Sequence, residues 1–352
     1  MSDQSSQRPR ATGLGLKIGL LPHGAHNAIT DVPRVSVGHV TLIDGEGILE
    51  IGRGPVRTGV TVILPHDGNI FQEKVTAAVY VLNGFGKSVG FPQVAELGRI
   101  ESPIALTSTL STWRVADALI DFLSEENPGV YSFNPIVGEC NDAYLNDIVG
   151  RHVTAEHVFQ AIRGAGSPNI EEGVVGAGTG MTGFGWKGGI GTSSRLCELP
   201  TGVFTVGVMT LTNTGDAREL RMDGVQIGRR LLPSDMMEDR GSIMMVVATD
   251  APLSSRQLGR VGRRAGMGLA RAGGIAGHGS GDFIIAFSNA TEQAHIEEEE
   301  LTTLFRGVVE STEEAIINSV LRAETVVGRD GNTRHGIPID RVSEILREHG
   351  VV

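Results

Sequence analysis

The stretch "DRGSIMMVVATDAPL", residues 239–253, is the starting point for the fold. Its apolar run from Ile243 to Ala248 is bounded by turn-forming residues on both sides, which is typical of a buried β-strand. The strand begins with a small hydroxyl residue, Ser242, directly after Gly241. A loop-to-strand junction explains this pair, since Gly and Ser are common there. The alternative is that the bond between the two residues is a place where chemistry happens.

Short apolar runs of this kind recur along the chain and alternate with helical patterns. The runs expected to be strands are 35–43, 59–65, 103–110, 135–139, 173–178, 202–213, 242–249 and 281–290, and the expected helices are 112–126, 154–166, 255–274 and 301–324. Ser254 and Gln257 form the spacing of a capping box at the start of the third helix. Long apolar strands with separate helix clusters predict an α/β layered sandwich. No Pro- or Ser-rich linker divides the chain, so we expect a disordered tail at 1–12 and a single domain at 13–352.

Composition excludes several classes of protein. The chain has 352 residues with a net charge of −11 and 5% aromatic residues, a poor composition for binding nucleic acid. Two cysteines in separate segments, Cys140 and Cys197, make neither a disulfide framework nor a zinc site. The N-terminus is polar and no apolar run reaches the length of a membrane span, so we expect a cytoplasmic protein that does not bind membranes.

Several local patterns fall short of known catalytic or cofactor motifs. The Gly-Lys-Ser at 86–88 lacks the glycine that a phosphate loop needs at position 81, which is Val81. The "GTGMTG" at 178–183 is followed by a glycine-rich segment rather than the helix of a dinucleotide site. The "GHGSG" at 277–281 misses the first glycine of a nucleophile elbow. We therefore expect no cofactor and no metal.

Five longer segments, in order, resemble the DmpA family of self-processing aminopeptidases. They are "HNAITDVPRVSVGHVTL" (26–42), "VGECNDAYLND" (137–147), "VVGAGTGMTGFGWKGGIGTSSR" (174–195), "GSIMMVVATDAPL" (241–253) and "GHGSGDF" (277–283). The family includes the L-aminopeptidase/D-amidase/esterase and the β-peptidyl aminopeptidases, and the resemblance spans residues 15 to 345. It implies an αββα sandwich that is similar in layering to N-terminal-nucleophile hydrolases but has its own connectivity. It also implies oligomers of αβ units.

The resemblance implies self-cleavage before Ser242, which would leave an α chain of residues 1–241 and a β chain of residues 242–352. A serine hydroxyl needs a base at neutral pH. The new α-amine of Ser242 supplies one, since such amines have a pKa of about 7.7–8.0 in model peptides. Gly241 lets the backbone bend toward its own carbonyl with the least strain. A catalytic serine can therefore work here without a histidine.

Further site residues are implied by the same resemblance. Ser280 and Asp282 would orient the Ser242 hydroxyl and amine, and their alternation along a strand places them on one face. On spacing alone, a Gly-Ser-Gly turn with a surface Asp is the favoured explanation. Asn213 would donate to the oxyanion, although without the family it would be a turn residue. Glu139 would hold the free amino group of the substrate.

Asn141 stands where some family members have a tyrosine that contributes to the oxyanion site, and Tyr144 lies three residues further on. Either side chain could donate a hydrogen bond, so the choice between them stays open. This departure from the family pattern bears on substrate preference.

Three functions are consistent with these residues. The first is a serine-type aminopeptidase that removes N-terminal residues from small peptides, amides or esters through an acyl-enzyme on Ser242. The second is an acyltransferase of the ornithine acetyltransferase type, whose new N-terminus is a threonine, so Ser242 argues against it. The third is a binding protein that has kept the fold, and the joint presence of Ser242, Ser280, Asp282 and Glu139 weighs against it.

Overall fold

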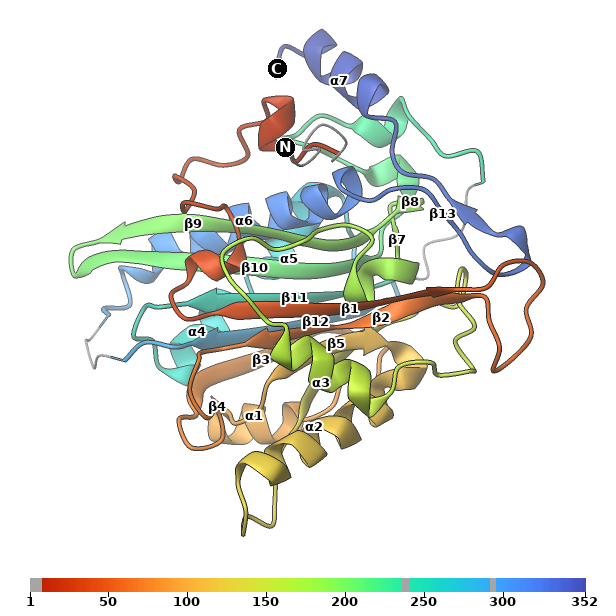
Figure 1. Cartoon of the computed structure of the whole chain (residues 1–352). Helices are drawn as coiled ribbons and strands as arrows, with labels where there is room; N and C mark the ends of the chain where they lie inside the picture. The colour runs from red at the N-terminus through yellow and green to blue at the C-terminus, as the bar shows by residue number, and fades with distance from the viewer. Residues whose placement is uncertain (1–7, 236–240, 292–295) are drawn as a thin grey trace, which may run out of the picture.

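Two stacked β-sheets form the centre of the protein in the computed structural model, which describes residues 8–235, 241–291 and 296–352 (Figure 1). The four-stranded sheet has the order β1 (Ser36–Asp44), β2 (Val56–Leu64), β5 (Ile104–Ser108) and β6 (Ile136–Cys140). The six-stranded sheet has the order β4 (Arg99–Ile100), β3 (Val75–Gly84), β12 (Gly281–Ser288), β11 (Ser242–Thr249), β10 (Gly202–Asn213) and β9 (Gly189–Leu199).

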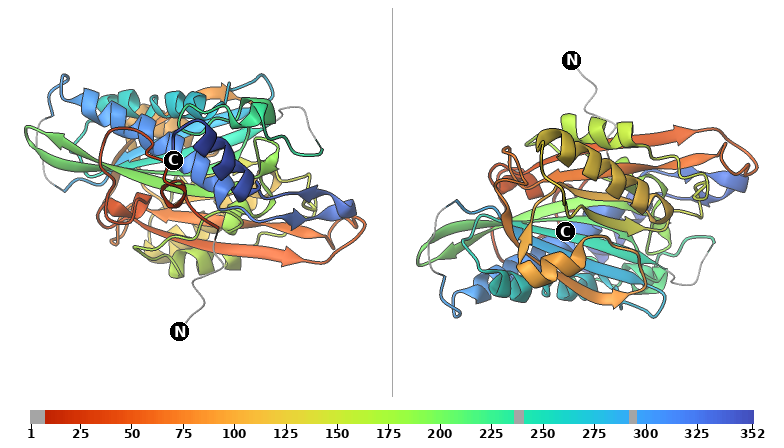
Figure 2. Two further views of the ribbon diagram at one scale, coloured as in Figure 1. Left: turned by 90° about the horizontal axis from the view of Figure 1, so that it is seen from above. Right: turned by 90° about the horizontal axis from the view of Figure 1, so that it is seen from below.

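Helices cover the outer face of each sheet, as the views from above and below show (Figure 2). The four-stranded sheet packs against α2 (Thr112–Glu126) and α3 (Ala155–Arg163). The six-stranded sheet packs against α4 (Ser255–Gly262) and α6 (Leu301–Leu321), and α5 (Ala265–Ala272) packs on α6. The remaining elements are α1 (Phe91–Leu97), α7 (Ile339–Glu348), and the short strand pairs β7 (Thr182–Gly183) with β8 (Trp186–Lys187) and β13 (Val326–Val327) with β14 (Thr333–Arg334). The predicted αββα sandwich is confirmed.

Strand β11 shows why its apolar run has no polar alternation. Side chains alternate between the faces of a strand, and both faces of β11 are buried. Met244, Val246 and Ala248 join the core between the two sheets. The other three apolar residues of the run, Ile243, Met245 and Val247, join the core beneath the helices. A strand in this position must be apolar throughout.

Two predicted elements differ in the structure. The segment 173–178 is not a strand, because it leads into a 3-10 turn at Gly176–Gly180. The single helix expected at 255–274 is two helices, because α4 ends at Gly262 and α5 begins at Ala265. The predicted capping box is confirmed, since the Ser254 hydroxyl accepts from the Gln257 backbone N–H. In addition, β3 and β9 form where no strand was predicted.

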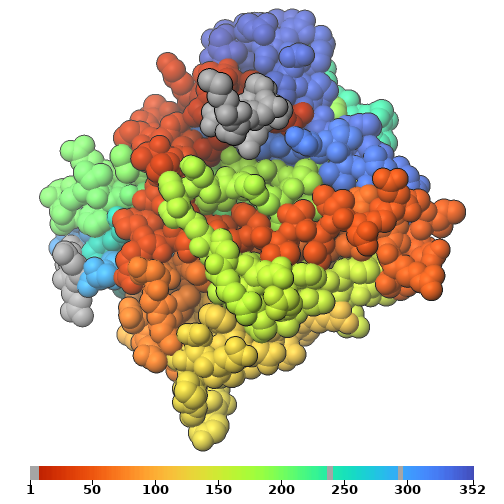
Figure 3. All heavy atoms as spheres, viewed as in Figure 1, coloured from red at the N-terminus to blue at the C-terminus, as the bar shows by residue number. Residues whose placement is uncertain are grey.

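The expected disordered tail is wrong for residues 8–12, while residues 1–7 lie outside the described residues. Ala11 is buried, and its backbone N–H donates to Asn318 Oδ1 at 2.8 Å. Arg10 donates to the carbonyl of Thr192 at 2.7 Å. Figure 3 shows this N-terminal segment, in red, packed against the body of the protein near the blue C-terminal helix. Apolar burial and these specific hydrogen bonds offset the entropy that ordering this segment costs.

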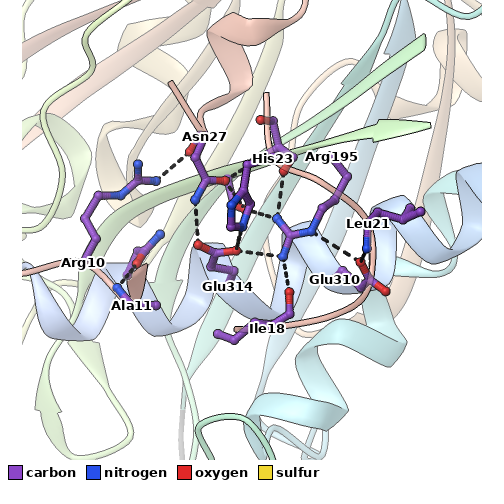
Figure 4. A network of polar contacts seen from close by, with 12 residues as sticks. Arg10, Ala11, Ile18, Leu21, His23, Asn27, Arg195, Glu310 and Glu314 are labelled. Carbon is purple, nitrogen blue, oxygen red and sulfur yellow. Dashed lines mark hydrogen bonds and ion pairs between the residues drawn. The ribbon is translucent and has the colours of Figure 1, made fainter. Parts of the chain in front are cut away.

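A buried charge network holds the N-terminal residues 23–27 to the six-stranded sheet and α6 (Figure 4). Arg195 of β9 is fully buried and lies 2.7 Å from Glu314 and 3.3 Å from Glu310, both on α6. Glu314 also accepts from Asn27 Nδ2 at 2.6 Å and contacts His23 Nε2 at 2.9 Å. The network therefore ties together three parts of the chain that are far apart in sequence.

Replacing Glu314 by Gln should lower the free energy of unfolding by about 3 kcal/mol. That is the lower end of the range for breaking a buried pair, because Glu310 still contacts Arg195. Burial opposes ionisation of Glu314, but the hydrogen bond from His23 and the charge of Arg195 lower its pKa from 4.5 to about 2. The stabilisation is therefore fully present above pH 4.5 and is lost as the pH falls from 4.5 toward 2.

Urea unfolding at several pH values measures this difference. The control is Glu344→Gln, which breaks an exposed pair with Arg341 and should change stability by less than about 1 kcal/mol. An unchanged stability of Glu314→Gln at pH 7, or a difference from wild type that grows below pH 4.5, would contradict the expectation.

Candidate active site

The topology of the six-stranded sheet gathers the predicted site residues at the start of β11. Strand β11 runs antiparallel to β10, so Ser242 pairs with Asn213 at the end of β10. It runs parallel to β12, so Ser242 also pairs with Gly281 at the start of β12, and Ile243 pairs with Asp282. Ser242 is buried between two strands that end or begin beside it.

Ser280 and Asp282 form a hydrogen-bonded pair next to Ser242. The Ser280 hydroxyl donates to Asp282 Oδ1 at 2.7 Å, in agreement with the expected placement of both side chains on one face. The Thr214 hydroxyl lies 3.4 Å from the Ser280 hydroxyl. Asn83 of β3 anchors the preceding turn by donating to the carbonyls of Ser280 and, at 3.0 Å, Gly277. The surface Asp suggested by spacing alone is wrong, because Asp282 is fully buried.

Asn213 is held by two segments, one on each side of its amide. Its Oδ1 accepts from the backbone N–H of Thr182 at 2.8 Å, and its Nδ2 donates to the carbonyl of Asn141 at 3.1 Å. The Oδ1 contact fixes which end of the amide is the donor. Because an amide nitrogen carries two N–H groups, one donor is left for a further acceptor.

Asn141 and Tyr144 both make contacts of their own. The Asn141 side chain is exposed and accepts from the backbone N–H of Ala143 at 2.9 Å. The Tyr144 hydroxyl donates to Asp235 at 3.3 Å, and the guanidinium of Arg334 lies 3.7 Å from the centre of its ring. Asn141 therefore meets Asn213 through its backbone carbonyl, whereas Tyr144 is engaged with Asp235.

Glu139 at the end of β6 is buried, and both of its carboxylate oxygens are engaged. One oxygen accepts from the backbone N–H of Lys87 at 2.8 Å, and the other accepts from the Thr109 hydroxyl. These donors fix the carboxylate at the rim of the sheet, where the segment after β3 passes. A carboxylate held in this way is a suitable partner for a cation.

Cys140 is a residue of this region whose place the sequence did not reveal. Its thiol is fully buried, donates to the carbonyl of Leu211 on β10 at 3.5 Å, and lies beside the Ser242 side chain. Burial raises the pKa of Cys140 well above its usual value, and the negative charges of Glu139 and Asp282 raise it further. The thiol therefore stays protonated and contacts Ser242 as a neutral group. No local pattern could have found it, because the contact joins β6 of one sheet to β11 of the other.

Gly241 occupies a position with no room for a side chain. A Cβ atom on it would lie 2.3 Å from the carbonyl oxygen of Asn213 and 2.4 Å from the Cα of Thr214. Both neighbours are backbone atoms, so neither could move without disturbing the end of β10. The carbonyl of Gly241 accepts from the Gly281 backbone N–H at 3.3 Å. The bond before Ser242 is thus pressed against the strand that carries Asn213.

Within residues 8–235, 241–291 and 296–352, no group of three or more His, Cys, Asp or Glu side chains is arranged to hold a metal ion. No helix in those same ranges combines the length and the apolar character that a membrane crossing requires.

Comparisons with known proteins identify the family of the chain. Residues 27–334 match the model of peptidase family S58. The β-peptidyl aminopeptidase BapA of Sphingosinicella xenopeptidilytica is 40% identical over 372 residues, which cover 96% of this chain and 91% of that protein.

Two solved structures match over 97% of this chain and 99% of their own, each with a TM-score of 0.90. They are a β-aminopeptidase from Burkholderia sp., at 38% identity, and the L-aminopeptidase D-Ala-esterase/amidase from Ochrobactrum anthropi, a variant of the N-terminal-nucleophile hydrolase fold, at 34%. The acyltransferase alternative is not favoured, because these relatives are aminopeptidases. The chain belongs to peptidase family S58, the DmpA family of self-processing aminopeptidases, and is a serine-type aminopeptidase.

Proposed function

We propose that the protein cuts itself between Gly241 and Ser242, and that Ser242 then releases N-terminal residues from small peptides, amides or esters. The observation that carries this proposal is the position of Ser242. It begins a fully buried strand, with Gly241 wedged against β10 and with Asn213 and Gly281 as its strand partners. The mature enzyme would consist of an α chain, 1–241, and a β chain, 242–352.

Self-cleavage begins when the Ser242 hydroxyl oxygen attacks the carbonyl carbon of Gly241. The carbon–nitrogen bond breaks, the hydroxyl proton passes to the released amine of Ser242, and an ester joins the two residues. Water then hydrolyses this ester to leave the carboxylate of Gly241 and the free hydroxyl of Ser242. The Gly281 N–H, which already donates to the Gly241 carbonyl, supports this step by stabilising negative charge on that oxygen.

Turnover uses the same hydroxyl with the new α-amine as its base. The amine accepts the hydroxyl proton while the oxygen attacks the substrate carbonyl, and the departing amine takes that proton. Water then releases the acyl group as a free carboxylic acid. The pair Ser280 and Asp282 supports this role by holding polar atoms next to Ser242, and the free N–H of Asn213 is suited to the oxyanion.

Glu139 supports selection of substrates with a free amino group, since a fixed carboxylate attracts an ammonium ion. Two relatives are a β-peptidyl aminopeptidase and a β-aminopeptidase, which supports peptides that begin with a β-amino acid as one class of substrate. We further infer a cytoplasmic enzyme, which the two free cysteines support, and a homo-oligomer of αβ units. No cofactor, nucleic acid or membrane takes part in the proposed reaction.

Ser242→Ala should remain a single chain of 37.2 kDa and should lose at least about a thousand-fold in kcat/KM. The wild type should give two masses that correspond to 1–241 and 242–352. Intact-mass spectrometry and hydrolysis of amino-acid p-nitroanilides measure both effects. Ser124→Ala, which changes an exposed serine on α2, should behave like the wild type. A Ser242→Ala protein that is cut and active would refute the proposal.

Gly241→Ala should slow self-cleavage by about 10- to 100-fold, because the added methyl group has to displace the backbone of β10. The rate is measured by following the two product chains on a gel after cell-free synthesis. The matched control is Gly166→Ala, since a Cβ at Gly166 meets nothing within 4 Å. Equal rates for Gly241→Ala and the wild type would show that the fit at Gly241 does not matter for cleavage.

Glu139→Gln should lower kcat/KM for a substrate with a free amino group by about 10- to 100-fold, the value of a hydrogen bond to a charged group. For an ester substrate in which a hydrogen atom replaces the amino group, Glu139→Gln should lower kcat/KM much less. Glu96→Gln, an exposed change on α1, serves as the control. If both substrates lose activity equally, Glu139 does not recognise the amine.

A further inference from the structure

Lys187 of β8 is a fully buried lysine with no part in the proposed chemistry. Its ammonium group donates to three backbone carbonyls, those of Gly178 at 2.9 Å, Met181 at 2.9 Å and Gly188 at 2.7 Å. An ammonium has three N–H donors, so each of them has a carbonyl acceptor within residues 178–188. Burying a charge is costly, and an apolar side chain here would leave three carbonyls without this donor.

The loop that Lys187 holds carries the donor that orients Asn213. Thr182 lies directly after Met181 and pairs with Lys187 between β7 and β8. The Gly188 N–H also donates to the Met181 carbonyl at 3.0 Å, which closes the loop around the ammonium. The Thr182 N–H donates to Asn213 Oδ1 at 2.8 Å. The position of the Asn213 amide thus depends on a loop whose carbonyls accept hydrogen bonds from the side chain of Lys187.

A second buried charge braces the other side of the same amide. Asp142 is fully buried and accepts from the Thr58 and Ser108 hydroxyls at 2.6 and 2.8 Å. The preceding residue, Asn141, accepts from Asn213 Nδ2 at 3.1 Å. The Asn213 amide therefore spans two segments, and each is fixed by a buried ionisable group.

We propose that Lys187 is a positioning residue for the oxyanion, which acts by holding the 178–182 loop so that the Asn213 amide keeps one N–H directed at the reaction centre. This inference rests on the proposed oxyanion role of Asn213. Burial lowers the pKa of Lys187 to about 7, and the charge of Asp142 opposes that shift. The three carbonyl acceptors match the three N–H groups of the protonated form, so all three contacts are made below pH 7.

Lys187→Met tests the proposal because methionine is apolar and of similar length. The expected result is a 10- to 100-fold loss of kcat with KM within about threefold, as for a group that acts in the transition state. Rates are expressed per cleaved molecule, counted by mass spectrometry. The matched control is Lys74→Met, which removes a lysine paired with Glu101 at the start of β3 and should keep the wild-type kcat. A wild-type kcat for Lys187→Met overturns the proposal.

A double-mutant comparison separates positioning from a general structural role. Asn213→Ala alone should lose about 100- to 1000-fold in kcat. If Lys187 acts through Asn213, the double variant should lie within about threefold of Asn213→Ala, whereas independent losses multiply. Multiplying losses refute the positioning role. A wild-type kcat for Asn213→Ala instead refutes the oxyanion role in the proposed function, so the two failures are distinguishable.

Hydrogen–deuterium exchange supplies a readout that needs neither cleavage nor turnover. Lys187→Gln keeps two N–H donors, and it takes the place of Lys187→Met if that variant does not fold. In a double variant with Ser242→Ala, which stays uncut, Lys187→Gln should speed hydrogen exchange at least tenfold in peptides that contain residues 178–183. Exchange in peptides of α2 should stay unchanged. Unchanged exchange at 178–183 shows that Lys187 does not hold the loop, and the proposal then fails.

Discussion

The hydrogen-bonded pairing of β11 with β10 on one side and β12 on the other is the constraint on which the site depends. One antiparallel and one parallel neighbour bring the end of β10 and the start of β12 to the same point, which is Ser242. Both faces of β11 are buried, so its register cannot slip by one residue without turning every side chain to the opposite core. Ser242, the proposed nucleophile, is thus positioned by a strand that is paired on both edges and buried on both faces.

Four of the buried charged groups lie where separate segments of the chain meet. Arg195 and Glu314 join β9 to α6, and Lys187 and Asp142 fix the two segments that meet Asn213. Each group is satisfied by several partners, as a buried charge requires. Apolar packing determines where the layers lie, and these charges fix the loops between the layers.

The sequence predicted those parts of the fold that follow from local patterns. The run 242–249 and the helix 112–126 have the observed bounds, because apolar periodicity alone defines them. Strand β9 escaped prediction because its two buried faces carry polar residues, among them Thr192, Ser193 and Arg195, whose hydrogen-bond partners include residues more than a hundred positions away. Ser280 and Asp282 came from family resemblance, since spacing alone favoured a turn. Cys140 could not be predicted, because its contact with Ser242 crosses the two sheets.

The strand order has a consequence for the cut enzyme. Strands β11 and β12 would belong to the β chain, yet they lie between β3 and β10 of the α chain. Neither chain could then keep the six-stranded sheet by itself, so the sheet has to form before the bond is cut. Refolding of the separated chains would become a bimolecular reaction that depends on concentration, while the precursor folds as one molecule. After cleavage the protein would no longer refold readily once it had unfolded. The lifetime of the mature enzyme would therefore be set by how slowly it unfolds.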